Sequence, residues 1–315
     1  MKTKKLLKIF VIFDLIILVL LAAFLFLNLE KQKLDANVRK LAVGEFVELP
    51  AGFVHYELSG ATEGDLVVLV HGFSVPYYVW DPTVDELLKE GYRVLRYDLY
   101  GRGYSDRPRV EYDLVFFEQQ ISDLTTVLVP GEPFHIIGLS MGGPIVASYA
   151  NHHPDLIKSV TFIAPEVLPV TEKDIFPMNV PLIGEWIVGT YLVPFNLPQS
   201  QLDDFYRPQD FPGWEEQYRE QLQYKGFKYA ILSTIRNLVK FNPLEIYENL
   251  QKTGIATLLI WGEEDQSVSY EAIVALLERL PDTQYHFVGE AGHLPQYEKA
   301  DVVTPVIIEF LQKNH

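Results

Sequence analysis

The middle of the chain reads Phe134-His-Ile-Ile-Gly-Leu-Ser140-Met-Gly-Gly-Pro-Ile-Val-Ala-Ser-Tyr-Ala150. The apolar run 134–137 predicts a buried strand, and the small residues after Gly142 predict a helix that packs closely against it. Between them, Gly-x-Ser-x-Gly forms a turn so sharp that its central residue adopts strained backbone angles, which small neighbours permit. Such a turn lifts the Ser140 hydroxyl clear of the sheet and directs the Met141 amide at the same space. The pattern therefore predicts a nucleophilic serine.

Strand-like and helix-like segments alternate on both sides of this unit. A hairpin is expected from strands 46–49 and 54–58, and further strands at 66–70, 93–98, 156–164, 256–261 and 284–288. Helices are expected at 116–129, 271–280 and 298–311. The alternation predicts an α/β fold with a mostly parallel central sheet and helices on both faces.

The pattern changes between Pro165 and about Leu250. Eight prolines occur from Pro165 to Pro212, and helices are expected at 214–224 and 227–241. We interpret residues 166–250 as an inserted, mainly helical cap domain, with 44–165 and 251–315 as the core domain. This domain covers the cleft either by packing alone or also as an apolar wall for an acyl chain, and a further interpretation lays residues 181–193 on a bilayer surface.

A second loop is expected beside Ser140, because strand 66–70 ends in His71-Gly72-Phe73-Ser74. A glycine just past a buried strand lets the backbone turn and present an amide to the cleft. We therefore predict that the amides of Phe73 and Met141 together stabilise an oxyanion. His71 is expected to brace this loop through hydrogen bonds rather than to take part in the chemistry.

The loop after strand 93–98 contains Asp98 and Asp106, with two glycines among polar residues. This composition indicates a turn-rich connection near the rim of the site. We expect both carboxylates to cap turns and to pair with Arg102 or Arg107.

An acidic residue that orients a catalytic histidine is expected after strand 256–261, in Gly262-Glu-Glu-Asp265-Gln. A turn opened by glycine suits a short side chain that points inward, which favours Asp265. Glu263 and Glu264 compete on chemistry alone. Glu166, just beyond the preceding strand, is the structural alternative.

The predicted base is His293, in Gly289-Glu-Ala-Gly-His293. Of the eight histidines, it alone lies in a glycine-containing loop after the last strand, where an imidazole can reach over the cleft. The residues of the site therefore follow one another as Ser140, Asp265 and His293.

With these motifs, residues 46–312 resemble the α/β-hydrolase superfamily. Within it, the Gly-Leu-Ser140-Met-Gly-Gly and Trp261-Gly-Glu-Glu-Asp265-Gln motifs look most like those of membrane-anchored serine esterases of the monoacylglycerol lipase type. Haloalkane dehalogenases and epoxide hydrolases have an aspartate as nucleophile, so Ser140 argues against both.

The resemblance implies hydrolysis of a lipid-derived ester, such as a monoacylglycerol, through an acyl-enzyme and without a metal or organic cofactor. C–C bond hydrolases share most of the motifs, and noncatalytic receptors occur on the same fold. Both remain alternatives, and a small soluble ester is a further possible substrate.

The amino-terminal segment is expected to be a membrane anchor. Residues 9–29 are an apolar run of 21 residues, interrupted only by Asp14 and Asn28 and preceded by four lysines. At 1.5 Å per residue, such a helix spans about 30 Å, the thickness of a bilayer core. A cleavable signal peptide is the alternative, but its apolar region is shorter and no small-x-small site follows Leu27. We therefore expect residues 1–29 to be an uncleaved anchor and 30–43 a polar, helix-prone tether.

Lysines and arginines are about equally numerous on both sides of the apolar run, but Glu30 and Asp35 add negative charge on its carboxyl-terminal side. They weakly favour a single-pass topology with the amino terminus inside and the globular part outside the cytoplasm.

Composition limits the partners of the globular part. The formal net charge of the 315 residues is −16, and because residues 1–29 hold four lysines and one aspartate, the remainder carries −19. Such a surface repels nucleic acid. The absence of cysteine excludes disulfides and thiolate sites. A small-molecule or lipid ester and the membrane are therefore the expected partners.

Overall fold

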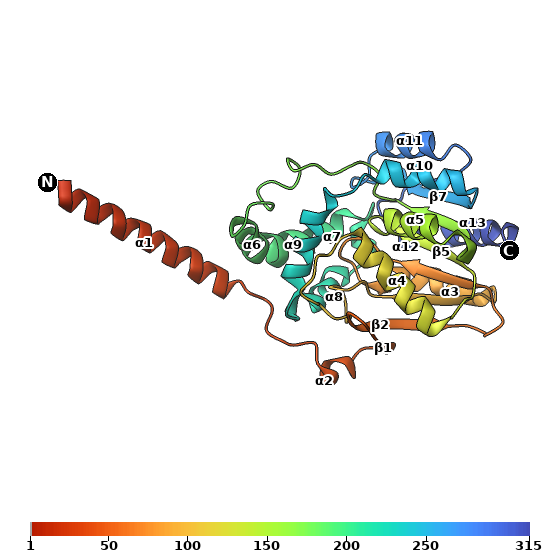
Figure 1. Cartoon of the computed structure of the whole chain (residues 1–315), viewed down its shortest axis with the longest axis horizontal. Helices are drawn as coiled ribbons and strands as arrows, with labels where there is room; N and C mark the ends of the chain where they lie inside the picture. The colour runs from red at the N-terminus through yellow and green to blue at the C-terminus, as the bar shows by residue number, and fades with distance from the viewer. Residues whose placement is uncertain (1) are drawn as a thin grey trace.

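One mixed sheet organises the fold. The computed structural model describes residues 2–315 (Figure 1), and their strands form a sheet of eight in the order β1-β2-β4-β3-β5-β6-β7-β8. The strands are β1 Glu45–Leu49, β2 Gly52–Ser59, β3 Leu66–Val70, β4 Arg93–Tyr97, β5 Phe134–Leu139, β6 Ile157–Ile163, β7 Ala256–Gly262 and β8 Gln284–Val288. β2 pairs antiparallel with β1 and β4, and all other neighbours are parallel. The mostly parallel sheet predicted from the sequence is confirmed.

The direction in which strands are added reverses between β3 and β5. After β3 the chain adds β4 on one side, and it then returns to add β5 on the other side, followed outward by β6, β7 and β8. In open α/β sheets, ligands bind outside the carboxyl ends of the strands at such a reversal. The residues that follow β3 and β5 here are His71 and Ser140.

Helices cover both faces of the sheet. One layer contains α4 (Leu114–Leu128), α5 (Gly142–His152), α10 (Pro243–Thr253) and α11 (Tyr270–Arg279), and the other contains α3 (Asp81–Lys89), α12 (Pro295–Glu298) and α13 (Ala300–Lys313). Between the layers, β3 and β5 are buried along their whole length, which explains their continuously apolar sequences. The expected helix 298–311 corresponds to α13, with α12 as a separate turn before it.

Two core helices, α3 and α10, are missing from the sequence-based expectations. Both carry proline in the first turn, where its fixed φ suits a helix start. Helix α10 packs on α5 and α11. Residues 243–250 therefore lie with the core helices, whereas the expected cap extended to residue 250. We propose that the cap ends at residue 242.

The cap consists of short helices that pack on the core through aromatic side chains. They are α6 (Ile183–Ile187), a π-helical segment (Val188–Asn196), α7 (Leu197–Asp203), α8 (Trp214–Glu220) and α9 (Phe227–Leu238). Phe205, Phe211 and Trp214 of the cap surround Tyr297 of α12 in edge-to-face contacts. These contacts attach the cap to α12.

The first helix, α1 (Lys2–Phe26), projects from the end of the body that carries the cap (Figure 1). By length and composition, its residues 4–26 suffice to cross a membrane. Its last turns contact the cap, since the Trp186 indole donates a hydrogen bond to the Leu20 carbonyl at 3.2 Å. The Phe24 ring also packs on Gly189, where a β-carbon would lie 2.6 Å from it.

The segment expected to be a tether pairs with the cap. The amides of Lys31 and Gln32 both donate to the Gln223 carbonyl, at 2.9 and 3.0 Å, and the Lys225 amide donates to the Gln32 carbonyl at 2.8 Å. A short helix, α2 (Ala36–Arg39), follows, and Arg39 forms an ion pair with Asp106 at 2.5 Å. Residues 31–39 therefore lie along the body of the protein.

Candidate active site

Ser140 occupies the strained turn between β5 and α5. Its φ is 52°, in the left-handed region that non-glycine residues rarely adopt. The Ser140 carbonyl accepts from the amides of Gly143 at 2.8 Å and Glu166 at 3.0 Å, and the Ser140 amide donates to the Ile163 carbonyl at 2.9 Å. These bonds hold the backbone in a conformation that it would otherwise avoid.

The glycines on either side of Ser140 are required because other backbone atoms approach them closely. A β-carbon at position 138 would lie 2.5 Å from the Gly142 carbonyl oxygen, and one at position 142 would lie 2.5 Å from the Val70 carbonyl oxygen. Neither position has room for a side chain, which explains the glycines that the sequence places around the serine.

His293 is paired with Asp265. Their Nδ1 and Oδ2 atoms are 2.9 Å apart, and the Asp265 side chain has no exposed surface. The second oxygen of Asp265 accepts from the amides of Ser267 at 2.7 Å and Val268 at 3.0 Å. The pairing fixes the tautomer that keeps Nε2 free to accept a proton.

The three other carboxylates weighed from the sequence have different positions. Glu263 and Glu264 hold the His293 loop through their amides, which donate to the carbonyls of Val288 at 2.9 Å and Ala291 at 3.0 Å. Burial raises the pKa of the Glu166 carboxyl to about 7. Among residues 2–315, the only carboxylate bonded to His293 is that of Asp265.

Ser140 and His293 line the same cavity, of about 450 Å³. The core contributes Gly72, Phe73 and the two candidate catalytic residues, and the cap contributes residues from Leu197 to Asp204. Within the described part of the chain, the amides of Phe73 and Met141 donate to no protein acceptor, so both can bind a ligand oxygen.

Buried polar side chains brace the Phe73 loop. His71 Nδ1 donates to the Gly72 carbonyl at 2.9 Å, and its Nε2 accepts from the Leu99 amide at 2.9 Å. Burial lowers the pKa of His71 to about 4, so the ring is neutral at pH 7. The contacts agree with the bracing expected of this histidine.

The expected pairing of Asp98 and Asp106 with Arg102 or Arg107 is wrong. Asp98 is bonded to His55 at 2.7 Å, and Asp106 to Arg39 at 2.5 Å. Asp98 does cap its own loop, since it accepts from the Tyr104 amide at 2.9 Å, whereas Asp106 accepts from the Phe53 amide of β2 at 2.8 Å. Their partners come from segments distant in sequence, which loop composition does not identify.

Arg102 instead connects the Phe73 loop with the cap. It is fully buried, and its Nε donates to the Phe73 carbonyl at 2.8 Å while another nitrogen donates to Thr234 Oγ1 of α9 at 2.9 Å. Arg107, the other expected partner, donates to the carbonyls of Ser105 and Gly103. The hydrogen-bond acceptors of these two arginines are thus carbonyl and hydroxyl oxygens instead of the expected carboxylates.

Asp204 is a second carboxylate beside His293, and no motif in the sequence marks it. Its carbonyl accepts from the His293 amide at 2.7 Å, and its carboxylate accepts from Ser267 Oγ at 3.3 Å. Burial raises the pKa of Asp204 to about 6. Burial alone would lower the pKa of His293, but the charge and hydrogen bond of Asp265, together with the charge of Asp204, raise it above its usual value.

Glu298 joins the histidine loop to the cap. One oxygen accepts from the Gly292 amide at 2.6 Å and the other from the Tyr206 amide at 2.8 Å. Gly292 also lets the cap backbone approach closely, because a β-carbon there would lie 2.5 Å from the Asp204 carbonyl oxygen.

Comparisons with known proteins identify the family of the chain. The family model described as alpha/beta hydrolase fold matches residues 65–300. The chain belongs to the alpha/beta hydrolase fold family. It is similar to Lipase 3 of Moraxella sp. (27% identical; 85% of this chain, 82% of the relative) and to the mouse monoacylglycerol lipase ABHD6 (23% identical; 79% and 76%). The enol-lactonase of Burkholderia xenovorans has the same fold (TM-score 0.74, 21% identical; 85% of this chain, 100% of the lactonase).

Replacing Gly292 by alanine is expected to lower the free energy of unfolding by about 1–3 kcal/mol, because the new methyl group overlaps the Asp204 carbonyl. Gly289→Ala is the matched control from the same loop, since its nearest neighbour, the Glu263 carboxylate, would be 3.5 Å away. Chemical denaturation compares the two variants. Equal stabilities would contradict the close approach of cap and loop.

Asp204→Asn is expected to lower the pKa of His293, because it removes a negative charge that favours the imidazolium form. Asp204 ionises at about pH 6, so its charge is present as His293, with its raised pKa, loses its proton. NMR titration of histidine labelled with ¹³C at Cε1 measures the shift. Asp203→Asn, which changes an exposed carboxylate of the same cavity, should leave the pKa of His293 unchanged. An unshifted His293 in Asp204→Asn would contradict the assignment.

Proposed function

We propose that the chain is a serine hydrolase that cleaves a carboxylic ester of a lipid, such as a monoacylglycerol, at a membrane. The observation that carries the proposal is the cavity lined by Ser140 and the Asp265-paired His293, near the amides of Phe73 and Met141, which donate to no acceptor among residues 2–315. Hydrolase activity itself is supported by the similarity to lipases. The serine nucleophile and the lipid ester are the proposed refinements.

In the first half of the proposed reaction, His293 Nε2 accepts the proton of Ser140 Oγ as this oxygen attacks the ester carbonyl. Asp265 stabilises the imidazolium that forms. The amides of Phe73 and Met141 donate to the developing oxyanion, where loss of one such donor typically costs about 3 kcal/mol. His293 then protonates the leaving alcohol, and the acyl group remains on Ser140.

The second half repeats the same proton transfers with water. His293 Nε2 takes a proton from a water molecule, whose oxygen attacks the acyl-enzyme carbonyl. Collapse of the tetrahedral intermediate returns the proton from His293 to Ser140 Oγ and releases the carboxylic acid. Helix α5 begins directly after Ser140 and Met141, so its amino-terminal dipole favours the negative charge in both halves.

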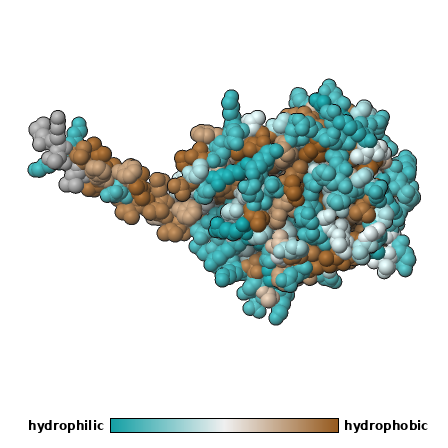
Figure 2. Space-filling model, in the orientation of Figure 1, coloured by the Kyte–Doolittle hydropathy of each residue, from teal (hydrophilic) through white to brown (hydrophobic). Residues whose placement is uncertain are grey.

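The lipid character of the substrate is supported by the position of α1. This helix ends against the cap, and apolar side chains lie exposed on the neighbouring cap segment, including Phe176, Leu182 and Tyr191. Figure 2 shows hydrophobic surface along α1 and at the end of the body from which it projects. An anchor there would bring the cap to a bilayer, with the body expected outside the cytoplasm.

Ser140→Ala is expected to abolish labelling by a fluorophosphonate and to reduce ester hydrolysis at least about 10⁴-fold, because the acyl-enzyme cannot form. Thermal unfolding of the variant should match that of the unmodified protein. Labelling that persists in a folded Ser140→Ala protein would remove this residue from the mechanism.

Among 4-nitrophenyl esters of increasing chain length, kcat/KM is expected to rise toward long acyl chains, and monoacylglycerol should be hydrolysed. A preference for acetate would contradict the lipid assignment while leaving the esterase intact. Cleavage of a vinylogous diketone without ester hydrolysis would indicate a C–C bond hydrolase. Tight binding without turnover would indicate a receptor.

A further inference from the structure

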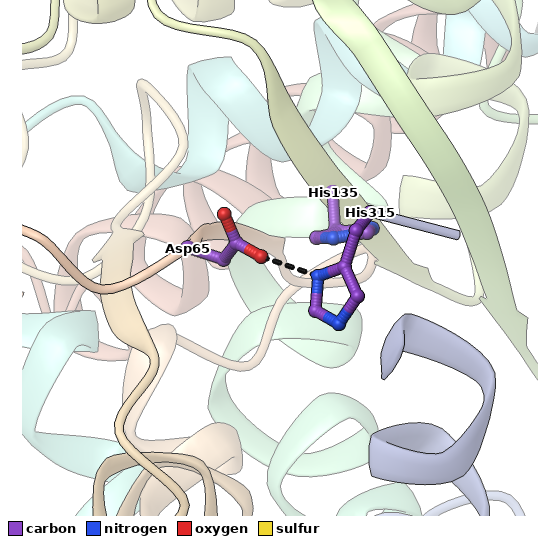
Figure 3. A group of neighbouring side chains, drawn as sticks. All are labelled: Asp65, His135 and His315. Carbon is purple, nitrogen blue, oxygen red and sulfur yellow. Dashed lines mark hydrogen bonds and ion pairs between the residues drawn. The ribbon is translucent and has the colours of Figure 1, made fainter. Parts of the chain in front are cut away.

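A cluster of polar side chains lies at the sheet edge opposite to the catalytic cavity. Asp65 immediately precedes β3, His135 is the second residue of β5, and His315 follows α13. Each offers a ligand atom, and these three atoms lie within 4.8 Å of one another. Figure 3 shows the rings of His135 and His315 beside the Asp65 carboxylate.

His135 supplies the observation that points to a ligand. It has no exposed surface, and within residues 2–315 its Nε2 has no hydrogen-bond partner. Its other nitrogen, Nδ1, is bonded to Ser159 Oγ at 2.8 Å, on the neighbouring position of β6. A buried polar nitrogen without a partner is costly and uncommon.

The ring of His135 is oriented by its other nitrogen, Nδ1. The hydrogen bond to Ser159 fixes the orientation of the ring, as the outer partner of a metal-bound histidine commonly does.

The Asp65 carboxylate accepts from two cationic or potentially cationic partners. Oδ2 lies 2.6 Å from His315 Nδ1, and Oδ1 lies 2.7 Å from Lys158 Nζ. Both contacts are of the kind that a carboxylate accepts from a charged or polar N–H group.

We propose that Asp65, His135 and His315 bind a zinc ion. Two imidazole nitrogens and one carboxylate oxygen suit zinc better than the hard ions Ca²⁺ and Mg²⁺. A tetrahedral site with bonds of about 2.0–2.1 Å brings its ligand atoms to about 3.4 Å from one another. His315 is more than half exposed, so its side chain can make this adjustment.

Such an ion would fasten the segment after α13 to the amino-terminal ends of β3 and β5. Ser140 follows the carboxyl end of β5, so the zinc would be structural and would not contact the ester. The proposal is independent of the proposed function. The chain has no cysteine, which leaves histidine and carboxylate side chains as its zinc ligands.

Lys158 gives the proposal a sharp test, because its ammonium group competes with a metal for Asp65. Lys158→Met should strengthen zinc binding by about threefold or more, whereas Lys158→Arg, which keeps the charge, should not. If the cluster is only a set of ion pairs, Lys158→Met will not strengthen zinc binding.

The experiment titrates the full chain, purified in detergent without a histidine tag, with ZnCl₂ against a fluorescent chelator and follows the melting temperature in parallel. We expect one zinc per chain and stabilisation that grows with zinc concentration. His315→Ala should weaken binding at least about tenfold and abolish the stabilisation. His152→Ala, which disrupts an exposed histidine–carboxylate pair with Glu118, is the matched control and should bind as the unmodified protein does.

Zinc binding that survives in His315→Ala, or that is lost equally in His152→Ala, would overturn the assignment. Absence of 1:1 binding would do the same. His135→Gln provides a second ligand variant, but His315→Ala alone decides the matter because the exposed side chain at 315 can be removed without disturbing the core.

Discussion

The backbone of Ser140 is the constraint on which the site depends. A serine at φ 52° is stable only because three backbone hydrogen bonds hold it and because glycines surround it. On the side of β3, a β-carbon on Gly72 would lie 3.0 Å from that of Ser140. The adjacent strand ends thus fix the hydroxyl between them, and the loops that carry His293 and Phe73 are arranged around that fixed point.

A buried cation, Arg102, connects the cap to the Phe73 loop. Arg102 is enclosed without a carboxylate partner among residues 2–315, and burial lowers its pKa to about 10, so it remains a cation at neutral pH. Its guanidinium lies 5.4 Å from the Phe117 ring centre and 5.6 Å from that of Phe73, where the aromatic faces offset part of the desolvation. Because the same group bonds the Phe73 carbonyl and Thr234 of α9, the position of the cap and that of a candidate oxyanion donor depend on one side chain.

The sequence predicts the parts of this structure that local rules determine. Strands β3 and β8 have the expected bounds, and the spacing of glycines marks the Ser140 turn because such a turn tolerates few other residues. The Asp265–His293 contact is suggested by the order of the motifs. By contrast, Asp204 and Glu298 act through contacts between cap and core, and an aspartate after a cap helix has no local feature that marks it. The partners of Asp98 and Asp106 are unpredictable for the same reason.

Backbone hydrogen bonds join residues 31 and 32 to residues 223 and 225, so the segment after α1 is attached to the cap and is not a loose linker. A cap that swings away from the core must either carry the amino-terminal helix with it or break these backbone hydrogen bonds. The cap and α1 therefore form one mechanical unit for as long as these hydrogen bonds persist.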